Sequence, residues 1–308
     1  MNTDVATTRS IPIVGLMFVL VGAFTFSAKA VIIKLAYGYG AEVSPIVLMT
    51  LRMVMSLPFF LVAGYLFQRG ANHAPLNRRD YVHLIGVGVL GYYLAAYLDF
   101  LGLSYISASL ERLVLLLYPT LVVLMSALFF RRPITRREAV ALLVSYVGIV
   151  IVFAEELSLA GADIILGSAL VFGSATAFAL YLVGSGELMK RMGAMRFTSY
   201  AMSIACIATI IHFGIDYDAA IYALPKEVYG LSLIMAVVCT VIPTFLMNAG
   251  IHRIGASPAA IVSSIGPVMT IFLAYLVLGE QLTFVQFIGA VLVMVGVFVV
   301  SNKKGKTK

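Results

Sequence analysis

The chain has 308 residues, of which 62% are hydrophobic and only 11% charged, and its mean hydropathy is +1.04. Soluble domains carry roughly 45–50% apolar and about 25% charged residues, so the composition excludes a soluble enzyme, a nucleic-acid-binding domain or a disordered chain as a description of the whole molecule. The net charge is +7, from 21 Lys and Arg against 14 Asp and Glu. We therefore expect an all-α integral membrane protein.

Apolar runs of about 20 residues, the length needed to cross a bilayer, recur along the chain. We expect ten transmembrane helices, at residues 11–35, 43–67, 81–103, 107–130, 136–153, 163–184, 195–213, 228–248, 256–278 and 283–301. The first run ends near Ala28-Lys29-Ala30, which imitates a signal peptide with its cleavage site. The apolar run continues through Val31-Ile32-Ile33, which favours a retained first span.

Lys and Arg collect on the cytoplasmic side of membrane proteins. With a cytoplasmic N-terminus and alternating spans, 16 of the 21 basic residues fall in cytoplasmic segments, Lys226 falls on the opposite side, and four lie within spans. We therefore expect a multi-pass protein of the cell inner (plasma) membrane with both termini cytoplasmic. The lipid bilayer accounts for the basic balance, and no nucleic-acid partner is expected.

The sequence contains an internal duplication. A shift of 148 residues aligns residues 98–152 with 246–300 without a gap, and a shift of 152 aligns the first span with the sixth. The identities include Gly102/Gly250, Ser109/Ser257, Pro119/Pro267, Thr135/Thr283, Gly148/Gly296 and Gly15/Gly167. We expect two five-span repeats, residues 11–153 and 163–301. Because five is odd, the second should be inverted relative to the first, as in secondary transporters with a substrate site near the membrane midplane.

Two paired segments carry a resemblance to a known family. Residues 106–130 (ISASLERLVLLLYPTLVVLMSALFF) and 254–283 (IGASPAAIVSSIGPVMTIFLAYLVLGEQLT), with the duplication, resemble the EamA-like family of the drug/metabolite transporter (DMT) superfamily. The second copy, ending in Leu278-Gly279-Glu280, is the more typical, whereas the first has Arg131-Arg132 where the family usually has Gly-Glu. The resemblance implies a membrane transporter, most often an exporter of amino acids and other small metabolites.

Six charged side chains lie at bilayer depth in the expected spans, all in the first repeat: Lys29, Lys34, Arg52, Asp99, Glu111 and Arg112. A charge at bilayer depth is costly and needs a partner or a water-filled cavity. At about 1.5 Å per residue, these groups lie in the outer half of the membrane. One interpretation is an ion-pair network that only packs helices together. The other is a substrate site in which three cations, held by Asp99 and Glu111, attract a carboxylate: Lys29, Arg52 and Arg112.

The corresponding positions of the second copy are less polar. Asp99 aligns with Met247 and Glu111 with Ala259. Hydroxyl and amide groups lie nearby instead: Thr240, Thr244, Asn248, Ser263, Ser264 and Thr270. We therefore expect polar contacts to close the outer gate and weaker packing to close the inner gate.

Tyrosines and prolines complete the candidate site. Five tyrosines could line a midplane site by stacking and hydroxyl bonding, or simply pack: Tyr92, Tyr93, Tyr97, Tyr118 and Tyr181. Proline removes a backbone hydrogen bond and bends a helix. We expect hinges or fixed kinks at Pro119, Pro243, Gly266 and Pro267.

Catalytic and metal-binding motifs are not found in the sequence. The four histidines lack H-x-x-x-H or H-E-x-x-H spacing, and neither G-x-x-x-x-G-K-[ST] nor G-x-S-x-G occurs. We expect no cofactor, no metal and no enzymatic activity, so that an ion gradient, exchange or the substrate's own gradient drives transport of a small-molecule substrate. The alternatives are an intramembrane enzyme using Asp99 and Glu111, or a membrane sensor. The substrate, the coupling ion and the choice between monomer and homodimer stay open.

Overall fold

The computed structural model describes residues 13–69, 76–131, 133–160, 163–255, 259, 262–263, 265–281 and 283–301, and its regular elements there are all helical. Eight helices in this part of the chain are long and apolar enough to cross a membrane, and two shorter apolar helices cover Gly266–Leu278 and Phe284–Val299. The molecule is therefore a helical, multi-pass membrane protein. The expected ninth span, 256–278, begins among residues outside the described ranges.

Several spans are built from more than one helical element. The first half comprises α1 (Ile13–Tyr37), α2 (Pro45–Arg69), α3 (Arg78–Gly88), η1 (Val89–Leu94), α4 (Ala95–Leu103), α5 (Ala108–Leu115), α6 (Tyr118–Phe130) and α7 (Arg136–Ala160). The second half comprises α8 (Asp163–Met192), α9 (Ala194–Ile215), η2 (Ala219–Tyr222), α10 (Lys226–Ala236), η3 (Val237–Val241), α11 (Ile242–Ile254), α13 (Gly266–Leu273), η4 (Ala274–Leu278) and α14 (Phe284–Ser301).

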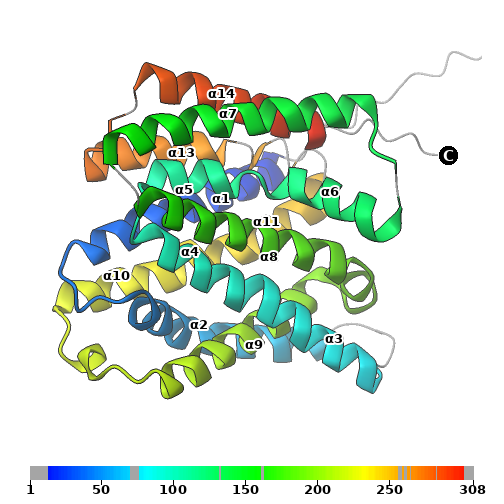
Figure 1. Cartoon of the computed structure of the whole chain (residues 1–308). Helices are drawn as coiled ribbons and strands as arrows, with labels where there is room; N and C mark the ends of the chain where they lie inside the picture. Colours follow the sequence, from blue (N-terminus) through cyan, green and yellow to red (C-terminus); the bar gives the residue numbers. More distant parts are fainter. Residues whose placement is uncertain are drawn as a thin grey trace, which may run out of the picture.

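The long helices run side by side, and their connections gather at two ends of the molecule (Figure 1). The α1–α2 and α4–α5 connections and the segment between α9 and α10 lie at the left of the view. The start of α3 and the α6–α7 connection lie at the right. We call these the α4–α5 end and the α6–α7 end. Under the orientation expected from the sequence, the α4–α5 end faces outward.

The same capping box begins α7 and α14. Thr135 N donates to Glu138 Oε2 at 2.9 Å while Glu138 N donates to Thr135 Oγ1 at 3.3 Å. Thr283 N donates to Gln286 Oε1 at 2.9 Å while Gln286 N donates to Thr283 Oγ1 at 3.2 Å. Each box satisfies backbone donors that a helix start otherwise leaves free. The two boxes stand 148 residues apart, so the duplication extends to this local structure.

The fourth span is interrupted beside a proline. α5 ends at Leu115, and α6 begins at Tyr118 with Pro119 as its second residue. In the second half α13 begins at Gly266 with Pro267 as its second residue, which is the same arrangement at the same offset. Proline suits the first turn of a helix because its missing N–H is not needed there. The chain therefore starts a new helix at each of these positions.

Two spans contain a π-helical turn at equivalent positions. η1 covers Val89–Leu94 and η3 covers Val237–Val241, so both begin at residues 148 apart. Pro243 follows η3 closely, and the sequence predicted an interruption at that proline. The first copy has Ala95 at the corresponding place and still forms its π turn. Proline is therefore not required for this irregularity. π turns interrupt helices with an extra residue and are frequent at functional sites.

Glycines allow close contacts between the two halves. A side-chain carbon added at Gly102 of α4 would lie 2.5 Å from Val171 Cγ2 of α8. One added at Gly250 of α11 would lie 2.5 Å from Val19 Cγ2 of α1. The duplication aligns Gly102 with Gly250 and Val19 with Val171, so the α4–α8 and α1–α11 contacts are equivalent. α7 packs along α14 in the same close manner. Such contacts are typical of helix association in membranes.

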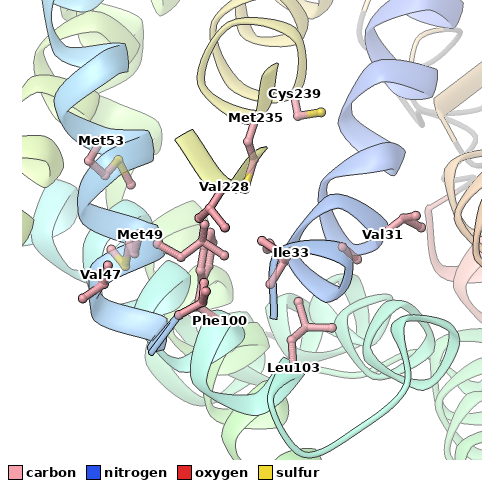
Figure 2. Close-up of a cluster of buried hydrophobic side chains, with 14 of the residues drawn as sticks. Val31, Ile33, Val47, Met49, Met53, Phe100, Leu103, Val228, Met235 and Cys239 are labelled. Carbon is pink, nitrogen blue, oxygen red and sulfur yellow. The ribbon is translucent and has the colours of Figure 1, made fainter. Parts of the chain in front are cut away.

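A buried apolar cluster fills the space between α1, α2, α4 and α10. Figure 2 shows Ile33, Met49, Phe100 and Val228 at its centre, each from a different helix. All four side chains are fully buried. This cluster fixes the helices that carry the buried charges described next.

Candidate functional site

Lys29 and Asp99 form an ion pair in the interior. Lys29 Nζ of α1 lies 2.5 Å from Asp99 Oδ2 of α4, and the two side chains are 11% and 2% exposed. Lys34, one and a half turns further along α1, donates to the carbonyl of Leu103 at 3.3 Å near the α4–α5 end. Of the two lysines, Lys29 therefore belongs to the buried cluster.

Glu111 of α5 joins this pair. The side chain is completely buried, and the groups that act on its carboxyl electrostatically include Asp99, Lys29 and Arg112. With both carboxyl groups ionised, neither oxygen of Glu111 has a hydrogen-bond donor among the residues described, although the Asp99 side chain lies within hydrogen-bonding reach. The structure thus brings three of the sequence-predicted residues, from three spans, to one place.

Arg52 of α2 is a buried cation whose guanidinium has no carboxylate at ion-pair distance in the described part of the chain. The residue is 5% exposed, and its Nε lacks a hydrogen-bond partner. Its Cζ lies 4.8 Å from the centre of the Phe100 ring, so the guanidinium rests on an aromatic face. Cys206 and Cys239, both free thiols, lie close enough to act on it electrostatically, as does Asp99.

Arg112 points toward α1 and α13. Its Cζ lies 5.5 Å from the centre of the Phe26 ring, and the Lys29 ammonium lies 5.7 Å from the same ring. A side-chain carbon added at Gly266 would be 2.8 Å from Arg112 Nη2. Glycine at 266 therefore leaves room for the guanidinium. Arg112 Nε has no hydrogen-bond partner within the described ranges.

Hydrogen bonds join α1 to α13 beside Arg112. Ser27 Oγ donates to the Gly266 carbonyl at 3.0 Å, and Thr270 Oγ1 donates to the Ser27 carbonyl at 3.0 Å. Gly266 and Pro267 are both buried. The structure places them in a contact between helices of the two halves. Sequence reasoning named Gly266 and Thr270 without predicting that they meet Ser27.

The tyrosines separate into two groups. Tyr92 of η1 and Tyr181 of α8 bring their hydroxyl oxygens to 2.9 Å, and their ring centres are 4.9 Å apart. Tyr118 packs edge-on against Phe178, whose ring stacks on Tyr181. This first group forms a continuous aromatic cluster between η1, α6 and α8.

Tyr93 and Tyr97 form the second group, which faces α9. Tyr97 contacts the ring of His212 at 4.8 Å between centres, and Tyr93 contacts the same ring at 5.9 Å. His212 Nδ1 is buried without a hydrogen-bond partner among the residues described. No motif in the sequence points to His212 as a neighbour of these tyrosines, because it has no partner residue at a fixed spacing.

Tyr97 also lines a hollow of about 460 Å³ at the α4–α5 end. The hollow lies between the start of α2, the end of α4 and the segment after α9. Polar groups in its lining include Ser44, Asp216 and Asp218. It opens beside the same helices, α2 and α4, that carry Arg52 and Asp99.

Three polar residues of the second half bind backbone carbonyls of their own segment. Each donates to the carbonyl four residues earlier, at 2.6 to 2.8 Å: Thr244 to Thr240, Asn248 to Thr244, and Ser263 to Ala259. Ser264 lies outside the described residues. Thr240 likewise bonds within its own span, to the Met235 carbonyl at 2.9 Å, whereas Thr270 bonds across to Ser27 of α1. Most of these hydroxyl and amide groups are therefore bonded locally, and Thr270 joins the two halves.

Two contacts at the ends of the molecule were missed by sequence reasoning. At the α6–α7 end, Arg191 of α8 forms a bidentate ion pair with Asp80 of α3, at 2.8 and 3.0 Å. At the α4–α5 end, Glu280 accepts hydrogen bonds from Ala108 and Ser109 at the start of α5. We expected weak packing at the former end, and the ion pair adds a polar contact there. Both carboxylates lie next to turns, where charged residues are common. Neither residue therefore stood out in the sequence as a contact between helices.

Comparison with known proteins shows what this chain is similar to. The sequence pattern of the EamA-like transporter family matches residues 13–154 and, separately, residues 165–302. The chain is 35% identical over 282 residues to a Bacillus subtilis (strain 168) protein named uncharacterized transporter YcbK, covering 89% of this chain and 88% of that protein. An uncharacterized transporter of Archaeoglobus fulgidus is 28% identical over 268 residues, 85% of this chain and 90% of that protein. A crystal structure with 16% identity superposes with a TM-score of 0.62 over 96% of this chain and 99% of that one, so the fold is shared.

Proposed function

Because the chain belongs to the EamA-like transporter family, we propose that it is a secondary active transporter of small polar metabolites that carry a carboxylate, such as amino acids. Its membrane-spanning helices and the names of its relatives support a membrane transporter. We further infer that it works by alternating access in the inner membrane, with both termini in the cytoplasm. The outward direction of transport rests on analogy with exporters of this family.

Arg52 is the residue that supports a carboxylate as the substrate group. A buried cation without a counter-ion is costly, so a site that keeps one gains from an anionic ligand. Arginine presents a planar fork of donors that matches a carboxylate. Lys29 is already neutralised by Asp99, so Arg52, and after it Arg112, are the cations available to a substrate carboxylate.

The equivalent contacts of the two halves support alternating access. When the sequence of one half is aligned with that of the other, the α1–α11 contact corresponds to the α4–α8 contact. The π turn of η1 corresponds in the same way to that of η3. We propose that the halves are inverted repeats and that the buried charges lie where they meet. The hollow at the α4–α5 end is then the outer entrance to the site.

Counterflow in proteoliposomes tests this proposal. Vesicles preloaded with pooled unlabelled amino acids and organic anions should take up the labelled substrate. We expect Arg52→Gln to reduce uptake roughly 10- to 100-fold, because a charge-assisted hydrogen bond contributes about 1.5–3 kcal/mol. Arg52→Lys should retain part of the activity because it keeps the charge but loses the fork.

Arg79→Gln is the matched control, because it removes an exposed arginine near the start of α3. Its uptake should equal that of the wild type. Arg52→Gln and Lys29→Gln proteins that insert normally and transport carboxylates at the wild-type rate would contradict the proposed site. Conversion of a pooled compound to a product by detergent-solubilised protein, without vesicles, would favour an intramembrane enzyme instead.

A further inference from the structure

Glu111 carries the most enclosed carboxyl group of the buried cluster. Its side chain has 0% exposure, and neither of its oxygens has a hydrogen-bond donor among the described residues. Asp99 Oδ1, the oxygen that does not contact Lys29, likewise has no donor there, and the two carboxyl groups lie within hydrogen-bonding reach of each other, so a proton on one can bond to the other. An ionised carboxylate in such a place is strongly disfavoured, whereas a protonated carboxyl is neutral and can itself donate a hydrogen bond.

The helices packed against α5 decide which charges Glu111 meets. α1 contributes Lys29, α4 contributes Asp99, and α5 itself contributes Arg112. Glu280 binds the free N–H groups at the start of α5, toward the α4–α5 end. Within the described ranges, the cluster that α7, α8 and α13 form with α5 is apolar and includes Ile149, Val152, Ile164, Val171 and Ile271.

These neighbours cannot neutralise two carboxylates at once. Lys29 has one ammonium group, and it lies 2.5 Å from Asp99. Arg112 follows Glu111 directly and points about 100° away around the helix, and the two form no ion pair in the described structure. Counting Lys29, Asp99 and Glu111 alone, full ionisation leaves one excess negative charge, which Arg112 and Arg52 offset only without an ion pair, and a proton on Glu111 removes it.

We propose that Glu111 binds and releases a proton during transport, and that Lys29 changes its partner in response. With Glu111 protonated, Lys29 pairs with Asp99, as in this structure. When the proton leaves to water, the Glu111 carboxylate attracts the Lys29 ammonium away from Asp99. The site releases one H⁺ and gains one negative charge. This inference rests on the proposed transport function and adds the proton as the coupled ion.

A change of partner at Lys29 would alter helix contacts in both halves of the molecule. Asp99 lies on α4 and Glu111 on α5, so the exchange alters how α1 packs against these two helices. Two residues before Lys29, Ser27 bonds to Gly266 of α13. A shift of α1 is therefore transmitted to the second half, as a helix shift at an interface requires.

Infrared difference spectroscopy of the purified, substrate-free protein in lipid tests the proton site. We expect the wild type to show the C=O stretching band of a protonated buried carboxyl group at neutral pH and to lose it in alkaline buffer. Glu111→Gln should abolish the band, and Glu111→Asp should shift it. Glu187→Gln, which removes an exposed carboxylate of α8, should leave it unchanged.

The response of Lys29 needs a second readout. A single cysteine at the α4–α5 connection, Ser104→Cys in a background without the two native cysteines, should react with a polar thiol reagent at a rate that depends on pH. Lys29→Gln should keep the infrared band and abolish this pH dependence. If Lys29 has only a structural role, the labelling rate should depend on pH in the same way in the wild-type and Lys29→Gln backgrounds.

The transport assay separates this inference from the proposed function. In proteoliposomes with the pooled amino acids and organic anions, a pH gradient should drive accumulation by the wild type. Glu111→Gln should lose the gradient-driven accumulation, measured relative to its own counterflow rate, because counterflow needs no net driving force.

An infrared band that persists in Glu111→Gln, or gradient-driven accumulation at the wild-type level in this variant, overturns the proton site and leaves the transport proposal intact. Failure of the wild type to exchange any pooled carboxylate overturns the substrate class instead, and the infrared result still decides the proton site. If Glu111→Gln does not fold, Glu111→Asp decides, because an unshifted band places the proton on another group.

Discussion

Glu280 and Ser109 come from opposite halves of the chain and contact each other directly. Glu280 Oε2 accepts hydrogen bonds from the Ser109 N–H at 3.1 Å and from its hydroxyl at 2.7 Å. Glu280 Oε1 accepts a hydrogen bond from the Ala108 N–H at 2.8 Å. The start of a helix has free N–H groups and a partial positive charge. A carboxylate of the second half therefore caps a helix of the first half at the α4–α5 end.

Glu280→Gln should destabilise this contact. The amide keeps the size of the side chain but loses the negative charge, so we expect a loss of about 1–2 kcal/mol, the scale of a partly exposed charge-assisted bond. The apparent melting temperature in detergent measures the loss. Glu227→Gln is the control, because Glu227 is an exposed residue in the first turn of its own helix, α10. Equal melting temperatures for Glu280→Gln and the wild type would contradict the assigned contact.

Arg191→Gln should weaken the α6–α7 end only slightly. The Arg191 side chain is 36% exposed, so water and salt screen its ion pair with Asp80, and exposed pairs contribute about 0.2–1 kcal/mol. We expect a small drop in melting temperature at low salt that vanishes at high salt. Asp80→Asn should cost more, because Asp80 also accepts the N–H of Asn77 in the capping box of α3. A larger loss for Arg191→Gln than for Asp80→Asn would disprove this order.

Gly102→Ala and Gly250→Ala should destabilise the protein to a similar degree. Each added methyl group would lie 2.5 Å from a valine Cγ2 across the helix contact, and such overpacking costs about 1–3 kcal/mol. Gly186→Ala on α8 is the control, because nothing lies within 4 Å of the added carbon there. It should be neutral or stabilising, since alanine favours helix over glycine. Thermal unfolding of the three variants makes the comparison, and equal stability of all three would contradict the close packing.

The starts of α6 and α13 could be predicted because proline marks them. Pro119 and Pro267 stand at the second position of α6 and α13, as their shared place in the duplication suggests. Counting residues along each span predicts Lys29 and Asp99 in one layer of the membrane, and the two side chains are in contact. Their direct ion pair did not follow, because helix rotation about its axis depends on packing with the other helices.

The contacts made at the ends of the fold could not be predicted in the same way. Glu280 belongs to a short polar turn, and nothing in its neighbourhood points to the start of α5, which lies 171 residues earlier in the sequence. The tyrosines gave a similar difficulty. Tyr92 and Tyr93 are adjacent and contact different partners, Tyr181 and His212, because neighbouring residues on a helix face different directions.

The π turn of η1 determines the directions around the helix axis in which the later side chains of the third span point. One extra residue in a turn rotates the rest of a helix by about 100° relative to a regular α-helix. Asp99 lies five residues beyond Leu94, the last residue of η1. A single-residue deletion within Val89–Leu94 would regularise the backbone, yet it would swing this carboxylate away from the Lys29 ammonium. The π turn thus orients Asp99 of α4 toward Lys29 of α1.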